Sequence, residues 1–303
     1  MRAQQQPRAS LLARTRDVID FFALSSPARF AITVFTGLVL LLTAILSLPI
    51  SSATGAVTPL ADALFTAVSA ICVTGLATVP MGTHWSLFGD VAILIGFQIG
   101  GIGVMTLASM LGLIVSRRLG LRAKLMAASD SNLSRMHHGP VAEGQAVRLG
   151  EIGGLLATVA ISTLVIEAAL TLLITPRLLL AGIDPWTATW HGFYYAASAF
   201  TNTGFSPNAE GVMLLADDPW FLSVLGIGVI LGSLGFPVIF ALMKALRGVR
   251  LTLHVKLTLV TTAVLFILGA IVILLLEWTN SSTLGAQDTA TRPLTALFMS
   301  AMT

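Results

Sequence analysis

The chain has little charge and almost no cysteine. Only 10% of its 303 residues are charged, whereas 55% are hydrophobic and the mean hydropathy is +0.90. A soluble fold of this size cannot bury that much apolar surface, and an intrinsically disordered chain would carry far less of it. The single cysteine, Cys72, cannot form an intrachain disulfide, so it gives no information about the redox compartment. The composition therefore predicts a membrane protein.

Five stretches are long and apolar enough for a helix to cross a hydrocarbon core of about 30 Å, which takes roughly 20 residues. They are Phe30–Ile50, Val91–Ser116, Ile152–Thr175, Phe221–Met243 and Leu257–Leu276. The first begins too late and runs too long for the apolar core of a signal peptide, so we expect the N-terminus to be retained. Pro237 removes a backbone hydrogen bond and is expected to kink the fourth span.

The basic residues are divided unevenly among the polar segments that separate these spans. Fifteen of the 17 lysines and arginines precede the first span or lie in the loops after the second and fourth spans, which leaves Arg177 and Arg292 for the other side. By the positive-inside rule the basic side is cytoplasmic and includes the N-terminus. A basic run can also bind nucleic acid, but a charge split that alternates with apolar spans is explained by membrane topology alone. We therefore expect lipid, and no nucleic acid, as a partner.

Two short apolar stretches on the opposite side, Leu60–Ile71 and Thr187–Ala199, are too short to span as helices. The segments Leu64–Gly75 and Phe193–Gly204 share Ala, Ser, Ala, Thr and Gly at five of twelve positions, at a constant separation of 129 residues. A dipeptide near the end of the chain, Leu297-Phe298, repeats the start of the first segment. The pattern predicts a repeating unit of span, short helix, Thr-Gly turn and span.

Small residues recur in the spans that follow these turns. The second span contains Gln98-Ile99-Gly100-Gly101-Ile102-Gly103, and the fourth contains Leu231-Gly232-Ser233-Leu234-Gly235-Phe236-Pro237. Small residues in a transmembrane helix let another backbone approach closely. We expect the approaching partner to be the short helix of the same unit.

A Thr-Gly turn at membrane depth must be buried in protein or line a water-filled cavity, because lipid cannot satisfy free backbone groups. Carbonyls that face such a cavity can replace the hydration shell of a monovalent cation, and glycine supplies the dihedrals that turn them the same way. Short helices with C-termini pointing inward would add partial negative charge. The alternative, two tight turns between interfacial helices and spans, is disfavoured by the matched flanks. The residues predicted to bind K⁺ through backbone carbonyls, as a selectivity filter, are Ile71, Cys72, Val73, Thr74, Gly75, Phe200, Thr201, Asn202, Thr203 and Gly204.

Taken in order, these motifs resemble those of the KtrB-type potassium-translocating subunits of the Ktr/Trk/HKT cation transporter family. The resemblance covers nearly the whole chain from the first span onward. It implies an all-α transmembrane fold of concatenated helix–pore-loop–helix repeats around a pseudo-fourfold ion path, with five spans and two complete re-entrant pore loops in this chain. It also implies potassium uptake across a bacterial inner (cytoplasmic) membrane, with K⁺ as the permeant ion, Na⁺ as an optional activator and no organic cofactor.

The same resemblance implies partners. Such subunits form homodimers and bind a cytosolic KtrA-type regulator, a ring that senses ATP, ADP or another nucleotide. The filter glycines would be Gly75 and Gly204, and glycine rather than the serine of sodium-preferring plant relatives favours potassium. One span precedes the first pore loop, which favours the Ktr branch.

The predicted segments follow from the spans and loops. They are a cytoplasmic N-terminal segment (1–29), a first repeat (30–116), a cytoplasmic loop (117–151), a second repeat (152–243), a second cytoplasmic loop (244–256) and the start of a third repeat (257–303). Because Leu297-Phe298 begins a third copy, we expect a third filter glycine about five residues after Thr303, followed by one further whole unit.

Several other residues have competing interpretations. Cys72 lacks a histidine–acid set, and His137-His138 lack a third ligand at metal spacing, so neither predicts catalysis or a metal site. An intramembrane protease would need a nucleophile–base pair or an H-E-x-x-H helix, and the sequence has neither, so we expect no enzyme. A non-conducting scaffold is a second alternative, but it leaves the paired turns unexplained. Glu167, the one acid inside a span, either snorkels outward or pairs with a pore helix. Six outer acids either concentrate cations or form a solvated surface: Asp62, Asp184, Glu210, Asp217, Asp218 and Asp288.

Overall fold

The computed structural model describes residues 27–106, 149–248 and 250–303. Within these ranges the regular elements are helices, and the one extended pairing is an isolated bridge between Ser52 and Trp85. The predicted N-terminal segment up to residue 26, the end of the second span and most of the first cytoplasmic loop, with His137-His138, lie outside the described residues.

The first unit comprises α2 (Pro27–Leu46), the short helix η1 (Pro49–Ser51), α3 (Leu60–Ile71), α4 (Met81–His84) and a helix described over Leu87–Thr106. α2 packs against α3. The core of this unit contains fully buried apolar side chains from α2, α3 and the Leu87–Thr106 helix, among them Leu46, Ala67 and Phe97.

The second unit comprises α6 (Leu149–Leu180), α7 (Pro185–Phe200), η2 (Gly211–Leu215), α8 (Pro219–Leu234) and α9 (Phe236–Ala245). α6, α7 and α8 pack against one another around a second apolar core. The third unit comprises α10 (Leu253–Glu277), η3 (Leu284–Ala286) and α11 (Arg292–Met302), and α11 packs against both α10 and α8.

The helix starts in the second unit follow a simple sequence signature. Asp184 and Asp218 each precede a proline, and their side chains accept hydrogen bonds from the backbone N–H groups of Thr187 (3.1 Å) and Phe221 (3.0 Å). An aspartate at the N-cap satisfies a donor that the helix leaves free, and proline at the next position has no N–H to lose. These caps fix where α7 and α8 begin.

In the part of the chain that the structure describes, three helices are long and apolar enough to cross a membrane, with qualifying stretches Leu87–Thr106, Leu156–Leu180 and Val255–Glu277. A fourth crossing is formed only if α8 and α9 are taken together. The first predicted span, Phe30–Ile50, ended four residues too late, because α2 ends at Leu46 and the chain then turns into η1. Its apolar stretch, Ala31–Leu46, is shorter than the three that qualify.

The predicted fourth span is not continuous. α8 and α9 meet at Gly235 with a bend of 102°. Gly235 has φ 73° and ψ 159°, a conformation that only glycine adopts readily, and Pro237 stands in the first turn of α9. The proline cannot continue the hydrogen-bond pattern of α8, so the predicted kink is confirmed at this place but is a full break in the helix.

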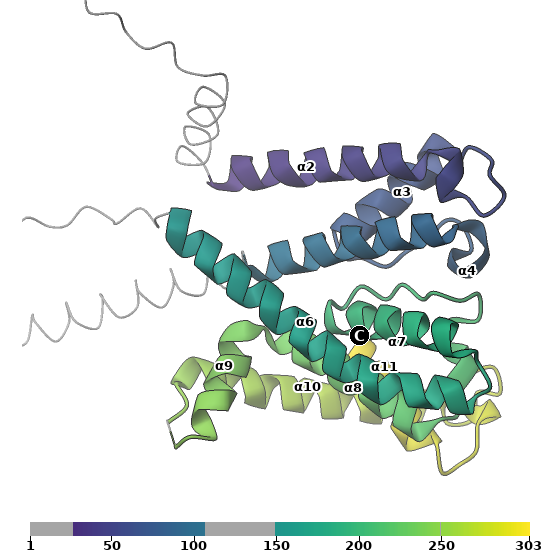
Figure 1. The fold of residues 1–303 in the computed structure, drawn as a ribbon. Helices are drawn as coiled ribbons and strands as arrows, with labels where there is room; N and C mark the ends of the chain where they lie inside the picture. Colours follow the sequence, from purple (N-terminus) through teal and green to yellow (C-terminus); the bar gives the residue numbers. More distant parts are fainter. Residues whose placement is uncertain (1–26, 107–148, 249) are drawn as a thin grey trace, which may run out of the picture.

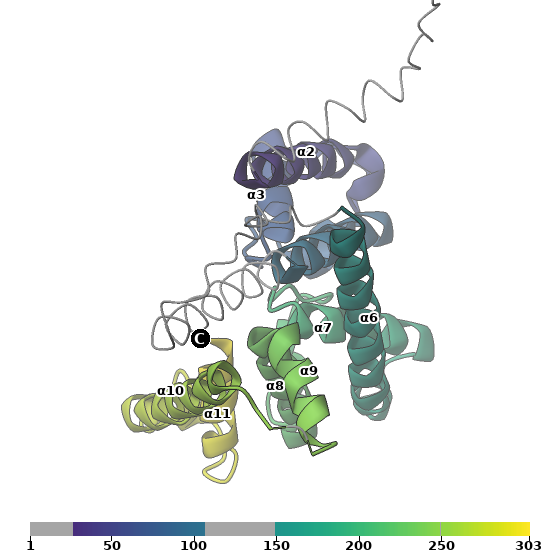
Figure 2. The ribbon, with the colours of Figure 1, turned by 90° about the vertical axis from the view of Figure 1, so that its left-hand side faces the viewer.

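The units follow one another across the molecule. In Figure 2, α2 and α3 lie at one end, α6 to α9 in the middle, and α10 with α11 at the other end. Figure 1 shows α6 crossing obliquely in front of the other helices, from the side of the first unit to that of the third.

Candidate functional site

The turns that follow α3 and α7 have the same backbone conformation. Val73 and Asn202 have φ values of 57° and 59°, and Gly75 and Gly204 have φ values of 73° and 92°. In each turn, left-handed residues therefore alternate with ordinary ones at positions 129 residues apart. A positive φ is uncommon outside glycine, and it is an outlier for a β-branched residue such as valine.

The hydrogen bonds that hold the two turns also match. Thr74 N–H donates to the Ser69 carbonyl at 2.7 Å, and Thr203 N–H donates to the Ser198 carbonyl at 2.9 Å. One residue earlier, the Val73 N–H donates to the Ala70 carbonyl at 3.0 Å. The Asn202 N–H likewise donates to the Ala199 carbonyl at 3.1 Å. The backbone carbonyls of 72–75 and 201–204 accept no hydrogen bond from any described residue. These carbonyls are therefore available to another partner.

The two turns touch each other. A Cβ atom at Gly75 would lie 1.7 Å from the carbonyl oxygen of Thr203, so the two backbones are in direct contact there. A Cβ atom at Gly204 would meet nothing within 4 Å. Gly75 is thus required both by its left-handed φ and by the neighbouring turn, whereas Gly204 is required by its φ alone.

Glycines of the following helices press against the ends of the short helices. A Cβ at Gly100 would lie 2.2 Å from the Ile71 carbonyl oxygen, and one at Gly232 would lie 1.8 Å from the Phe200 carbonyl oxygen. These are the last residues of α3 and α7, so the prediction that each glycine motif faces the short helix of its own unit is confirmed. Gly101 extends the contact to the second unit, because its Cβ would lie 2.9 Å from the Thr201 methyl carbon.

Hydroxyl groups brace the second turn but not the first. The hydroxyls of Thr201 and Thr203 are hydrogen-bonded at 2.6 Å, and the Ser198 hydroxyl accepts from the Gly204 N–H at 3.1 Å. In the first turn the buried Ser69 hydroxyl has no partner among the described residues, and Cys72, in the place of Thr201, is exposed. The sequence repeat pairs these serines, but it did not indicate that only one of them braces its turn.

A cavity of about 490 Å³ adjoins the two turns. Thr74, Gly75, Asn202, Thr203 and Gly204 line it, together with side chains of α7, α8 and α11. It is bordered by backbone of both turns, and it is therefore the place in the described structure where a cation could meet carbonyl groups of two units.

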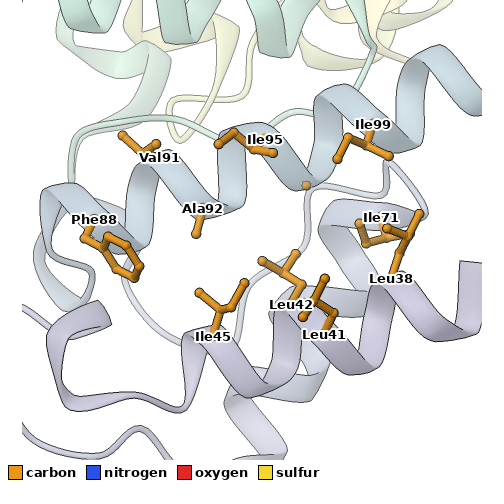
Figure 3. Close-up of a pocket in the computed structure, with 11 residues that line it drawn as sticks. Leu38, Leu41, Leu42, Ile45, Ile71, Phe88, Val91, Ala92, Ile95 and Ile99 are labelled. Carbon is orange, nitrogen blue, oxygen red and sulfur yellow. The ribbon is translucent and has the colours of Figure 1, made fainter.

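A second hollow differs in chemistry. It has a volume of about 230 Å³ and lies between α2 and the Leu87–Thr106 helix. Figure 3 shows it lined by hydrocarbon side chains, including Leu38, Ile45 and Phe88. No hydroxyl, amide or charged side chain lines it, so it offers nothing to coordinate an ion.

Both predictions for the buried acid Glu167, snorkelling outward and pairing with a pore helix, are wrong. Its exposure is 0%, which excludes snorkelling to the surface. Its partner is not on a short helix, since Nε2 of Gln98, in the Leu87–Thr106 helix, donates to its Oε2 at 2.5 Å. The contact joins the first unit to the second, and sequence reasoning missed it because it depends on how two distant helices cross.

Two of the six outer acids, Asp184 and Asp218, stabilise the fold through hydrogen bonds and an ion pair. The hydrogen bonds from Thr187 lower the pKa of Asp184, which caps α7. Partial burial alone would raise the pKa of Asp218, but hydrogen bonds from Arg177 and the Phe221 N–H, with the Arg177 charge, bring it below its ordinary value. Asp218 and Arg177 form an ion pair at 2.9 Å that ties α8 to the end of α6. The other four acids, Asp62, Glu210, Asp217 and Asp288, are exposed or half-buried.

A metal site of the ordinary kind is not formed in the described residues, where no three His, Cys, Asp or Glu side chains converge. The candidate site described above consists of the backbone of the two turns. Of the ten predicted residues, five line the cavity: Thr74, Gly75, Asn202, Thr203 and Gly204. Cys72, Val73 and Thr201 belong to the turns without lining it, and Ile71 and Phe200 end the short helices.

Comparison with known proteins points to cation transport. The TrkH family profile, described as a cation transport protein, matches residues 8–302. The chain is 33% identical to the Ktr system potassium uptake protein B of Bacillus subtilis, over 84% of this chain and 53% of the relative. It is also 33% identical to the Ktr system potassium uptake protein B of Vibrio alginolyticus, over 90% of this chain and 57% of the relative.

A third relative carries a broader name. The chain is 29% identical to the potassium/sodium uptake protein NtpJ of Enterococcus hirae, over 91% of this chain and 58% of the relative. The chain thus spans about half the length of the curated relatives it matches. All three are named uptake proteins rather than enzymes.

Proposed function

Since the chain belongs to the TrkH family of cation transport proteins, we propose that it forms part of a path by which K⁺ crosses a bacterial cytoplasmic membrane. In this proposal the turns after α3 and α7 are two walls of a selectivity filter, and Ile71–Gly75 and Phe200–Gly204 supply its backbone carbonyls. A complete ring needs about four such walls.

One observation carries the proposal: the two turns share an unusual backbone and lie in contact. Left-handed φ values at Val73, Gly75, Asn202 and Gly204 alternate with ordinary ones in both copies. Such a backbone costs free energy, about 1–3 kcal/mol for each strained non-glycine residue, and persists only where its surroundings hold it. Carbonyls without protein partners next to a shared cavity are what a dehydrated monovalent cation requires.

The surroundings favour a cation in a second way. α3 and α7 end at Ile71 and Phe200, directly before the two turns. The C-terminal end of a helix carries a partial negative charge. Both short helices thereby direct this charge at the cavity, which attracts K⁺ and repels anions.

We propose that the glycine at position 75 favours potassium over sodium, as the family resemblance implies. A side chain there would strike the Thr203 carbonyl and displace the neighbouring wall. Among the relatives, two are named for potassium uptake and one for potassium and sodium uptake. We propose K⁺ as the main permeant ion, with Na⁺ as an activator.

Assembly is proposed from the relatives' names and from charge. Two relatives are named as parts of a Ktr system. We propose that the protein is a homodimer, that its basic side faces the cytoplasm, and that a cytosolic KtrA-type ring binding a nucleotide regulates it there.

The test is ion uptake by the full-length product of the gene, reconstituted in liposomes. An inward K⁺ gradient should drive uptake that protein-free liposomes lack, and K⁺ should compete with Rb⁺ far better than Na⁺ does. A correctly folded, reconstituted protein that moves no K⁺ would contradict the proposal. Equal uptake of K⁺ and Na⁺ would retain a cation path but remove the proposed selectivity.

A further inference from the structure

Glu167 is the most deeply buried acid of the described residues. It lies in the middle of α6 with 0% exposure, in a helix whose qualifying membrane stretch is Leu156–Leu180. Its carboxyl Oε2 accepts a hydrogen bond from Gln98 Nε2 at 2.5 Å. An ionised carboxyl in such surroundings is costly unless it is paired with a cation, and an amide carries no charge.

The remaining oxygen atoms of this pair are both unsatisfied. Glu167 Oε1 and Gln98 Oε1 are buried, and neither has a hydrogen-bond partner among the described residues. A carboxylate accepts hydrogen bonds but cannot donate, and an amide oxygen also only accepts. As an ionised pair, the two side chains therefore leave two buried acceptors without a donor.

A single proton on the carboxyl group would give both buried oxygens a hydrogen-bond partner. We propose that Glu167 is a neutral carboxylic acid in the folded protein and that it forms a reciprocal pair with Gln98. The amide N–H donates to Oε2, and the acid O–H on Oε1 donates to the amide oxygen. The pair then forms two hydrogen bonds, leaves no buried oxygen of either side chain without a partner, and has no net charge.

Charged groups elsewhere on these helices do not compensate an ionised Glu167. Asp90, eight residues or about 12 Å before Gln98 along the helix, is itself an acid and would add negative charge. Arg177 stands ten residues after Glu167, about 15 Å along α6, and it is paired with Asp218. A neutral acid is thus the state that the neighbourhood supports.

The pair stands close to the candidate filter. Gln98 precedes Gly100 by two residues and Gly101 by three, and these glycines press on the Ile71 carbonyl and the Thr201 methyl group. Rotation or sliding of the Leu87–Thr106 helix would move both contacts at once. On the proposed function, Glu167 is therefore a positioning residue, which fixes the helix against which both turns rest.

The protonation state has a direct spectroscopic test in the full-length protein. Infrared spectra at neutral pH should contain a protonated carboxylic acid carbonyl band that shifts on ¹³C-glutamate labelling and is lost in Glu167→Gln. Absence of such a difference, with a carboxylate band lost instead, would overturn the proposal. This measurement needs no ion flux, so its outcome is independent of the proposed function.

The positioning role has a separate test with matched variants. Glu167→Gln keeps one donor and one acceptor without charge, and should retain K⁺ uptake within about twofold, whereas Glu167→Ala and Gln98→Ala should lose about tenfold, or about 1.4 kcal/mol. Leu172→Ala is the control, because Leu172 lies on the same helix and is 75% exposed, and it should leave K⁺ uptake unchanged. If Glu167→Gln is as damaging as Glu167→Ala, a neutral pair is not what the site needs. If all variants conduct like the parent, the positioning role is wrong although the transport function stands.

Discussion

Val73 is the residue at which the first turn carries most of its backbone strain. Its φ of 57° costs a β-branched residue about 1–2 kcal/mol. Asn202, at the matching place in the second turn, tolerates a φ of 59° far better. Hydroxyl bonds brace the second turn, whereas contact of Gly75 with the Thr203 carbonyl supports the first. The first turn therefore depends on the second for its shape.

Gly75→Ser should raise Na⁺ permeation relative to K⁺. The new side chain is strained by about 1–2 kcal/mol at φ 73°, and its Cβ would displace the Thr203 carbonyl of the neighbouring wall. Uptake of both ions by a potassium-uptake-deficient bacterium measures the ratio. Gly55→Ser is the matched control, since Gly55 has φ 71° but open space around it. Unchanged selectivity in a well-expressed Gly75→Ser protein would remove Gly75 from the filter.

Asp218→Asn should destabilise the protein at neutral pH but not in acid. Asparagine still caps α8, so the change removes mainly the charge that pairs with Arg177, worth up to about 1 kcal/mol for a partly exposed pair. The pKa of Asp218 is lowered in the fold, so its contribution is present above the unfolded value of about 3.9 and is lost as pH falls through the lower folded value.

Thermal unfolding in detergent, compared between the parent and Asp218→Asn, measures this contribution. The two proteins should differ at pH 7 and converge as the pH falls below about 4. A difference that persists unchanged into acid would mean that the carboxyl acts through something other than its charge.

At the scale of the helix, the packing of the Leu87–Thr106 helix and of α8 against the short helices depends on single glycines. Gly100 and Gly232 let the backbone of the following helix reach the last carbonyl of α3 and of α7. At Gly96 and Gly228, one turn earlier, a Cβ would meet leucine side chains instead, 2.6 Å from Leu42 Cδ2 and 3.1 Å from Leu170 Cδ1. Gly100 and Gly232 therefore allow contact with a backbone carbonyl, whereas the glycines one turn earlier make room for side chains.

Gly100→Ala should destabilise the protein by about 1–3 kcal/mol, because a Cβ 2.2 Å from the Ile71 carbonyl oxygen forces the backbone to shift. Gly37→Ala on α2, where a Cβ meets nothing within 4 Å, should be neutral or stabilising by about 0.5–1 kcal/mol. The midpoint of thermal unfolding in detergent distinguishes them. Equal midpoints for the two variants would show that this contact can relax without cost.

Local sequence signals predicted the elements better than their contacts. The first short helix was predicted at Leu60–Ile71 and lies there, whereas the second begins two residues before its predicted start because Asp184 and Pro185 cap it. The left-handed residues were expected to be glycines, and Val73 and Asn202 were missed because their dihedrals are imposed by the turn rather than by their own preference.

Tertiary contacts lay beyond sequence reasoning. The partner of Glu167 and the contact between Gly75 and Thr203 join residues more than 65 positions apart in the chain. No local pattern indicates how two distant helices cross. The repeat predicted that two turns exist, but only the structure brings them together.

At the scale of the whole molecule, the charge distribution predicts which ends of the helices share a side of the membrane. Asp217 precedes α8, and Arg247 follows α9, so the bent pair separates them. α8 alone has 16 residues and is about 24 Å long, somewhat less than a hydrocarbon core of about 30 Å. Placing Asp217 and Arg247 on opposite sides thus requires the bend near Gly235 to lie close to one membrane surface.

Labelling of introduced cysteines tests this topology in intact cells. Cys72 is exposed and must first be replaced, for example by Cys72→Ser, so that it does not react itself. An impermeant thiol reagent should then label Asp217→Cys from outside, whereas Arg247→Cys and Arg122→Cys should react only after permeabilisation, because basic loops are retained in the cytoplasm. Arg247 and Asp217 are both exposed, so neither result is limited by burial. Labelling of Asp217→Cys and Arg122→Cys from the same side would contradict the positive-inside assignment. Outside labelling of Arg247→Cys together with Asp217→Cys would mean that α8 and α9 form a hairpin that returns to the side it entered from.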